Sequence, residues 1–188
     1  MLSKIFKLVS IIIFFLYQNS LHSKTTADVD FNPKYLSNYF SALLAYDNQN
    51  NNEAIKYFNS SKNLIKKHDK FLKQYVFSLV LNGQIKDAIK QIKLSKNKNS
   101  ANFFEAYVLL LVDSLQKQKF EKSDLILNEL QKFKNYGTYQ FVIYETLKSY
   151  KNLFKTKKID NNAEQNFGKL SLITEAFQNC HLENPRAK

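Results

Sequence analysis

The residues of this chain that could do chemistry are few and widely spaced. Cys180 beside His181 has the residue types of a thiolate and its base. Neighbours on a helix point about 100° apart, whereas a nucleophile normally meets its base through folding. We therefore interpret this pair as chance neighbours near a helix end. The other histidines, His22 and His68, are distant in sequence, and none of the three lies in a metal-ligand spacing such as H-E-x-x-H.

Acidic and glycine-rich patterns give no stronger catalytic signal. Asp28 and Asp30 are interpreted as solvated charges of a linker rather than a metal pair. The chain contains only 3 Gly and no glycine-rich phosphate loop. The sequence therefore predicts no catalytic residues, no metal site and no cofactor, and it favours a binding protein over an enzyme.

The composition predicts one all-helical domain. The 188 residues are 44% hydrophobic and 14% aromatic, which is ample for a core. Three Gly and 2 Pro are too few for the tight turns of a sheet-rich protein. The single cysteine, Cys180, has no second cysteine in the chain to pair with.

The net charge of the chain supports fewer conclusions about its partners than the magnitude of that charge suggests. The net charge is +12, but Arg186 is the only arginine. Specific readout of bases and phosphates favours the planar fork of arginine, so specific nucleic-acid binding is not supported. A weak association with an anionic membrane surface remains open.

The N-terminal residues have the layout of a secretory signal peptide. Lys4 and Lys7 precede an apolar run of about ten residues, 8–17, shorter than the ~20 that a membrane-crossing helix needs. We predict a signal peptide over 1–23, cleaved after Ser23, and export to the periplasm or envelope of a bacterium. An uncleaved anchor in the inner membrane is the alternative. Residues 24–32 are expected to form a flexible lead-in.

Apolar spacings of three and four predict a series of helices after residue 32. Asn32 and Pro33 have the types of an N-cap and first helical residue. Gly83 suits a helix end, Ser100 or Asn102 is expected to cap a later helix, and Asn161 with Glu164 resembles a capping box. The predicted helices cover about residues 33–46, 52–66, 71–80, 85–92, 103–115, 120–130, 139–154 and 163–177.

One local pattern recurs along these helices. Ala54 and Ala88 stand 34 residues apart, each after an acidic residue and before Ile-Lys, and the large residues Phe58 and Ile92 follow them. A further step of 35 residues reaches Ser123, between Phe120 and Leu127. This period is typical of stacked helical hairpins, which display surface for partners.

The pattern resembles the tetratricopeptide repeat, a 34-residue helix-turn-helix unit of protein-interaction scaffolds. Its small sites, where helices cross, match Ala42, Ala54 and Ser61 in one unit and Gly83, Ala88 and Ser95 in the next. Larger residues, Val76, Leu111 and Leu130, occupy other usually small sites, and the family's tryptophan and terminal proline are absent. A related helical-hairpin solenoid therefore stays open.

The resemblance implies a right-handed α-solenoid of three to four hairpins over residues 33–181, followed by a disordered tail, 182–188. It also implies a concave, mostly apolar groove that would bind a protein or peptide. Carried onto this chain, the groove residues are Tyr39, Leu43, Tyr46, Lys73, Phe77, Val80, Glu105, Val108 and Val112. The alternative is that these side chains are core, covered by the fourth hairpin.

Two other functions remain open at this point. The chain could be a cationic surface binder for anionic lipid or cell-wall polymer. It could also be the front part of a longer repeat array, or self-associate, because Leu170, Leu172, Ile173 and Phe177 keep an apolar face near its C-terminal end. The identity of the partner is not encoded in any motif we recognise.

Overall fold

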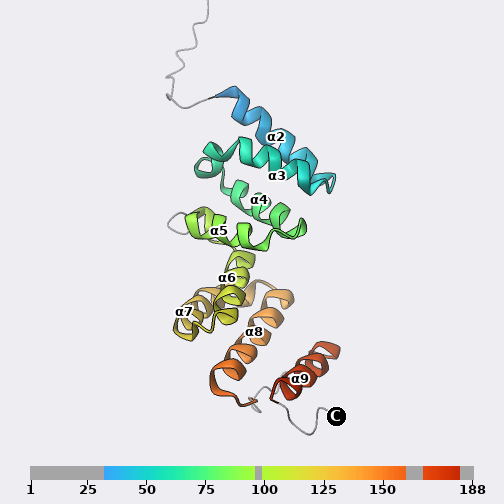
Figure 1. The fold of residues 1–188 in the computed structure, drawn as a ribbon, viewed down its shortest axis with the longest axis vertical. Coiled ribbons are helices and arrows are strands. Elements are labelled where there is room, and N and C mark those ends of the chain that lie inside the picture. Colours follow the sequence, from blue (N-terminus) through green and yellow to red (C-terminus); the bar gives the residue numbers. More distant parts are fainter. Residues whose placement is uncertain (1–31, 96–98, 160–166, 183–188) are drawn as a thin grey trace, which may run out of the picture. The chain divides into compact units, whose positions relative to one another are not determined.

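The computed structural model describes residues 32–95, 99–159 and 167–182, and within them every regular element is a helix (Figure 1). The predicted all-helical class is confirmed for these residues. The predicted signal peptide, most of the lead-in, the Asn161–Glu164 capping box and all of the tail but Leu182 lie outside them and stay predictions. The α-helices are α2 (Pro33–Asp47), α3 (Asn51–Ser60), α4 (Asp69–Leu81), α5 (Ile85–Ser95), α6 (Phe104–Gln116), α7 (Phe120–Gln131), α8 (Thr138–Thr156) and α9 (Lys169–His181).

Three short 3-10 helices join these elements: η1 (Lys62–Lys66), η2 (Asn99–Ala101) and η3 (Lys134–Tyr136). The first of them corrects a prediction, because the expected helix 52–66 ends at Ser60. Ser61 leaves the helical backbone at φ −116° and ψ 15°, and its hydroxyl donates to the Tyr57 carbonyl at 2.8 Å. Such local side-chain bonding by serine competes with a continuing helix.

Two further helix starts differ from the predictions. Neither Ser100 nor Asn102 caps α6, whose N-cap residue is Phe103. The segment Asn99–Ala101 forms η2 instead, and the Asn102 Oδ1 accepts a hydrogen bond from the Tyr107 hydroxyl at 3.3 Å. Helix α9 begins at Lys169 rather than at 163, directly after Gly168, whose φ of 61° and ψ of −131° are not helical.

Three helix pairs, α2–α3, α4–α5 and α6–α7, are joined by the same turn. Gln49, Gly83 and Gln118 occupy equivalent places and have φ values of 60°, 75° and 53°. The next residue in each turn donates its N–H to the carbonyl five residues earlier, at 2.8, 2.8 and 2.9 Å. These bonds form the Schellman motif, which satisfies carbonyls at a helix end. The predicted helix end at Gly83 is confirmed.

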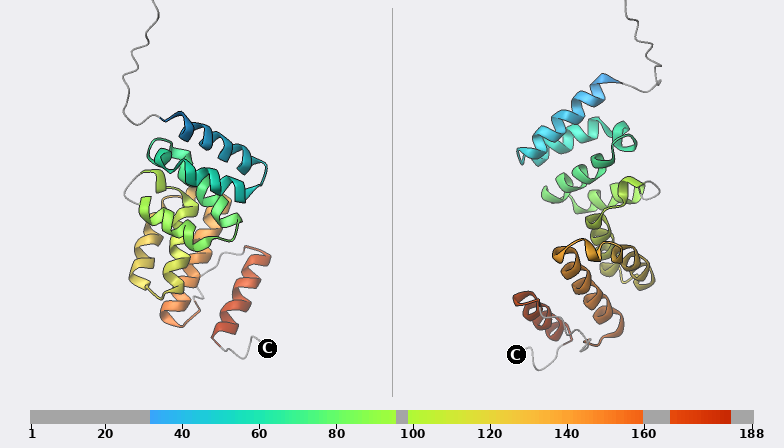
Figure 2. Two further views of the ribbon diagram at one scale, coloured as in Figure 1. Left: turned by 45° about the horizontal axis from the view of Figure 1, so that its top comes forward. Right: turned by 180° about the vertical axis from the view of Figure 1, so that it is seen from behind.

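From α3 to α9, each helix contacts the next one along the chain, and α2 lies beside α3 (Figure 2). Helix α4 contacts α3 and α5, α6 contacts α5 and α7, and α8 contacts α6, α7 and α9. Ala54, Ala88 and Ser123, from the second helix of each pair, are all fully buried. The recurring sequence positions therefore share one kind of environment.

Aromatic side chains fill the interior between the first helices. Phe58 of α3 is fully buried, and its ring centroid lies 5.1 Å from Phe71, 5.6 Å from Tyr75 and 6.3 Å from Tyr39. These contacts join α2, α3 and α4 in one core. The Tyr75 hydroxyl donates to the Asn59 Oδ1 at 2.6 Å, and burial together with the charge of Asp87 raises the pKa of Tyr75 to about 12.

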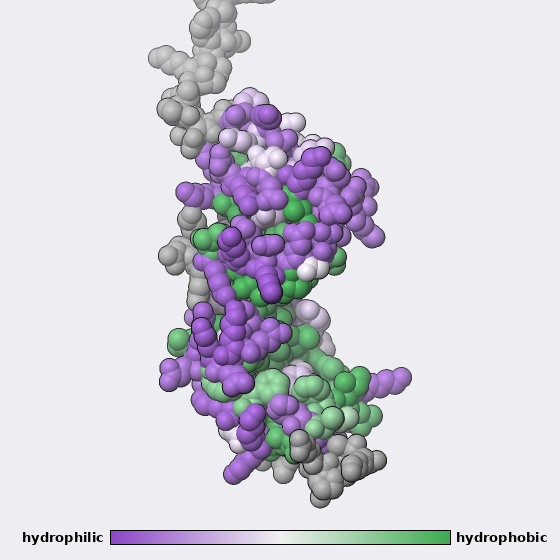
Figure 3. All heavy atoms as spheres, in the orientation of Figure 1, coloured by the Kyte–Doolittle hydropathy of each residue, from purple (hydrophilic) through white to green (hydrophobic). Residues whose placement is uncertain are grey.

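The last helix is attached differently from the others. Gln178 of α9 is buried and donates to the Ser149 hydroxyl of α8 at 2.7 Å, and the Phe177 ring lies 5.3 Å from Tyr150. Leu172 and Ile173 remain more than 60% exposed. Figure 3 shows hydrophobic surface gathered over α8 and α9. No helix in the described residues has the length and apolarity to cross a membrane.

Candidate functional site

The predicted groove residues lie on α2, α4 and α6, the first helices of the three pairs. Most of their apolar members are half-buried, and Val112 is 38% exposed. We call the apolar set the first-helix strip; it consists of Leu43, Tyr46, Phe77, Val80, Val108 and Val112. Leu43, Tyr46, Val80 and Val108 also pack against the buried core. The strip is therefore partly core and partly surface.

Tyr39, by contrast, belongs to the core and not to the strip. It is 7% exposed, and its ring stacks on that of Phe71 at 5.2 Å. A partner would have to displace this packing to touch it. For Tyr39, burial favours the alternative that the predicted groove residues are core.

The two charged groove residues are paired with each other. Lys73 Nζ of α4 lies 3.2 Å from the Glu105 carboxylate of α6, and it also sits over the rings of Phe77 and Phe103 at 5.5 and 5.8 Å. The Glu105 side chain is 30% exposed, and its Oε2 atom is buried. This ion pair bridges two helix pairs across the strip.

Most predicted repeat-packing residues are interior. Seven of them are buried and at most 6% exposed: Ala42, Ala54, Phe58, Ala88, Ile92, Ser123 and Leu127. Phe120 is half-buried and packs against the same core. Gly83 is the exception, because a Cβ at this position would meet nothing within 4 Å. It serves the turn through its positive φ and does not pack between helices.

Two serines lie where α6 and α7 cross. The Ser114 and Ser123 hydroxyls lie 2.7 Å apart and are buried. Each hydroxyl also lies within hydrogen-bonding distance of a carbonyl of its own helix or turn, Leu111 for Ser114 at 2.8 Å and Lys119 for Ser123 at 3.0 Å. Because each hydroxyl carries one hydrogen, one serine donates to the other, and the second donates to its carbonyl. Buried polar groups need such partners to avoid a desolvation cost. The polar crossing is thus satisfied internally.

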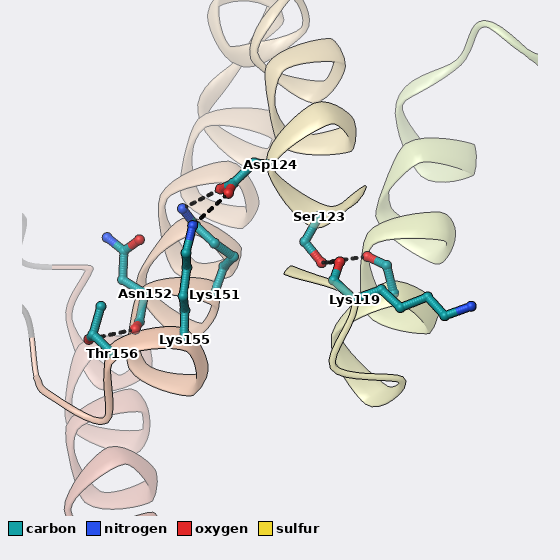
Figure 4. A network of polar contacts seen from close by, with 8 residues as sticks. Lys119, Ser123, Asp124, Lys151, Asn152, Lys155 and Thr156 are labelled. Carbon is teal, nitrogen blue, oxygen red and sulfur yellow. Dashed lines mark hydrogen bonds and ion pairs between the residues drawn. The ribbon is translucent and has the colours of Figure 1, made fainter. Parts of the chain in front are cut away.

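Asp124 of α7 connects this pair to α8 (Figure 4). Its carboxylate accepts hydrogen bonds from Lys151 and Lys155 of α8 at 2.7 and 2.9 Å. Hydrogen bonds from these two lysines, followed by their charges, outweigh partial burial and lower the pKa of Asp124 below its ordinary value. The carboxylate stays ionised and holds α8 against α7.

Asp113 of α6 is a charged residue that sequence reasoning missed. Its side chain is 12% exposed and pairs with Lys93 of α5 at 2.6 Å and with Lys117. Burial raises the pKa of Asp113, but hydrogen bonds and charge from Lys117 and Lys93 outweigh burial and leave the pKa below its ordinary value. The 20-residue separation of Asp113 and Lys93 carries no sequence signal, because the contact depends on how α5 meets α6.

These residues line a pocket between α5 and α6 of about 420 Å³. Lys86, Lys90, Lys93, Ile89 and Leu94 line it from α5, and Asp113 and Lys117 line it from α6 and the residue after it. Its lining contains four lysines and one aspartate, a net charge of +3. The pocket lies apart from the predicted groove residues, none of which lines it.

Cys180 and His181, at the C-terminal end of α9, have different surroundings. Cys180 is exposed, and the His181 ring stacks on Phe177 and meets Phe154 edge-on at 5.1 Å. Among the described side chains, no group of three or more His, Cys, Asp or Glu is placed to hold a metal ion. His68 likewise stacks on Tyr39, at 5.1 Å.

Comparison with known proteins adds no relative: no family model, no curated protein and no solved structure matches this chain.

Proposed function

We propose that this chain is a non-enzymatic scaffold of tetratricopeptide-like helical repeats that is exported to the bacterial envelope and binds a protein or peptide along the first-helix strip. The observation that carries the proposal is the shared turn of the three helix pairs, with a fully buried small residue at the same place in each second helix. Stacked hairpins of this kind present their first helices as one recognition surface.

The chemistry of the strip favours an amphipathic helix or an extended apolar segment as partner. Val112 of α6 is 38% exposed and Phe77 of α4 is half-buried, and neither is among the strip residues that pack against the buried core. The Lys73–Glu105 pair between these helices offers one donor and one acceptor next to the apolar surface. Burial of apolar side chains would supply affinity, and the ion pair would restrict orientation.

Affinity capture from the native envelope tests the proposal. The bait is the full chain, compared with a Phe77→Glu/Val112→Glu variant whose charges oppose apolar burial. A matched control, Leu44→Glu/Leu125→Glu, adds the same charge at leucines that are 65% and 68% exposed outside the strip. We expect a discrete partner to be captured by the wild type and the control, and to be lost from the strip variant.

Circular dichroism of the three proteins separates loss of binding from loss of fold. If the strip variant unfolds while the control stays folded, the strip is core and the proposed binding surface is refuted. If all three capture the same partner, the partner binds elsewhere. Export is tested separately, by locating the chain in fractionated cells and sequencing its mature N-terminus, with cleavage after Ser23 expected.

The alternative of a cationic surface binder predicts another response to salt. Attraction between exposed lysines and an anionic polymer is screened over about 8 Å at physiological ionic strength, whereas apolar burial is nearly indifferent to salt. Capture that survives added salt therefore supports the strip. Capture that disappears with salt supports the alternative.

A further inference from the structure

The pocket between α5 and α6 is a second candidate binding site, independent of the first-helix strip. Its volume of about 420 Å³ lies within the usual range for small-molecule sites. Lys86, Lys90 and Leu94 follow each other at intervals of four residues, with Ile89 and Lys93 beside them, so they occupy one face of α5. The opposite face of α5, with Ala88 and Ile92, is fully buried.

The lining combines apolar walls with free positive charge. Leu94 is 69% exposed and Ile89 is half-buried. The long stems of lysine add apolar surface while their ammonium groups stay in solvent. Lys93 and Lys117 are engaged by Asp113. Lys86 and Lys90 are exposed, and within the described part of the chain no ion pair engages either of them.

The donors and acceptors of the pocket lining restrict the class of ligand further. Lysine ammonium groups only donate. The one acceptor in the lining, the Asp113 carboxylate, already accepts from Lys93 through Oδ2 and from Lys117 through Oδ1. A peptide segment or a sugar would bring several N–H or O–H donors, for which the lining side chains offer only the remaining lone pairs of this one carboxylate. Each buried donor left without a partner carries a desolvation cost. A ligand that brings only acceptors avoids this cost.

We propose that this pocket binds a single-chain anionic amphiphile, with its carboxylate or phosphate headgroup between Lys86 and Lys90 and its alkyl chain against Ile89 and Leu94. The headgroup accepts charge-assisted hydrogen bonds from the two lysines. The alkyl chain covers a leucine that the protein otherwise leaves in water. The net charge of +3 in the lining favours the anion over a neutral detergent of equal length.

Isothermal titration calorimetry of the full chain with four probes tests the proposal. Sodium decanoate and decyl phosphate carry both parts of the ligand and distinguish the two headgroups. Inorganic phosphate carries a headgroup alone, and decyl glucoside carries the alkyl chain without charge. We expect saturable binding of at least one decyl anion below its micelle concentration, and at least ten-fold weaker binding of inorganic phosphate and decyl glucoside.

Variants locate the site. Lys86→Gln/Lys90→Gln removes the proposed headgroup contacts at exposed positions, and Leu94→Ser removes the apolar wall. The matched control Lys66→Gln/Lys67→Gln removes the same charge at exposed lysines outside the pocket. We expect the first variant to bind the decyl anion about ten-fold more weakly or worse, the scale of one lost hydrogen bond to a charged group. Leu94→Ser is expected to weaken binding as well, and the control to leave it unchanged.

Several outcomes would overturn the proposal. Equal affinity for inorganic phosphate and decyl phosphate would reduce the pocket to an anion site, and equal affinity for decyl glucoside would remove the need for charge. Equal weakening by the control would trace binding to overall charge. Absence of saturable binding of either decyl anion would refute the site itself. Because none of its lining residues belongs to the first-helix strip, the pocket can fail while partner capture succeeds, and the reverse.

Discussion

The three pairs from α2 to α7 and the final pair α8–α9 are built on different principles. The first three repeat one Schellman turn and bury one small residue at the same place in each second helix. The final helix is attached instead through a long-range polar bond, Gln178 to Ser149, and aromatic contacts around Phe177. Local, repeated signals thus specify the first region, whereas individual long-range contacts specify the last.

The largest difference between the two regions is expected in the aromatic core. Phe58→Ala removes a fully buried ring that touches three other rings. We expect a loss of about 3 to 5 kcal/mol in the free energy of unfolding, measured by urea denaturation. The matched change on α9, Phe177→Ala, concerns a side chain that is 47% exposed and should cost less than about 1 kcal/mol. Equal losses would place both pairs in one continuous core.

The crossing of α6 and α7 differs from the crossings of the other two regular pairs in having a serine in place of an alanine. Ser123 is fully buried at the place that Ala54 and Ala88 occupy. Ser123→Leu should overpack this crossing and cost about 1 to 3 kcal/mol in thermal unfolding. Ser123→Ala should cost about 1 kcal/mol or less, because Ser114 keeps its bond to the Leu111 carbonyl. A neutral Ser123→Leu would show that this crossing is loosely packed.

The part of the fold predicted from the sequence is the part that local chemistry determines. The 34- and 35-residue steps identified Ala54, Ala88 and Ser123 as equivalent, and each is buried, because a close helix approach requires a small side chain wherever it recurs. Of the three equivalent turn positions, only Gly83 has a residue type that predicts a turn. Gln49 and Gln118 adopt the same positive φ without a glycine, since the Schellman hydrogen bonds offset the strain.

The candidate sites were harder to predict because they depend on distances between helices. Tyr39 has the spacing of a groove residue, yet the rings of Phe58 and Phe71 enclose it. Asp113, Lys93 and Lys117 meet only because α5 lies against α6. No periodicity of charge distinguishes these lysines from the many others in a chain of net charge +12.

Acid titration tests the two carboxylates that join successive helix pairs. The folded pKa values of Asp113 and Asp124 lie below the ordinary value near 3.9, so their stabilisation is present above about pH 4 and is lost as the pH falls through the folded values. We expect Asp113→Asn to cost about 1 to 2 kcal/mol at pH 7 and to reduce the loss of stability below pH 4. Glu121→Gln, at an exposed residue of α7, is the control. An unchanged acid profile in Asp113→Asn would remove this residue from the acid response.

The smallest expected effects compare the three turns directly. Gly83→Ala places a side chain at φ 75° in open space, so backbone strain alone should cost about 1 kcal/mol. Gln118→Gly makes the reverse change at φ 53° and should stabilise the chain by about 0.5 to 1 kcal/mol. Gln131→Gly, at the exposed end of α7, is the control for glycine in a helix and should destabilise. If Gly83→Ala lowers the stability in thermal unfolding and Gln118→Gly raises it, the two turns are energetically equivalent. A loss of stability in Gln118→Gly would instead show that the Gln118 side chain, and not the backbone alone, stabilises the third turn.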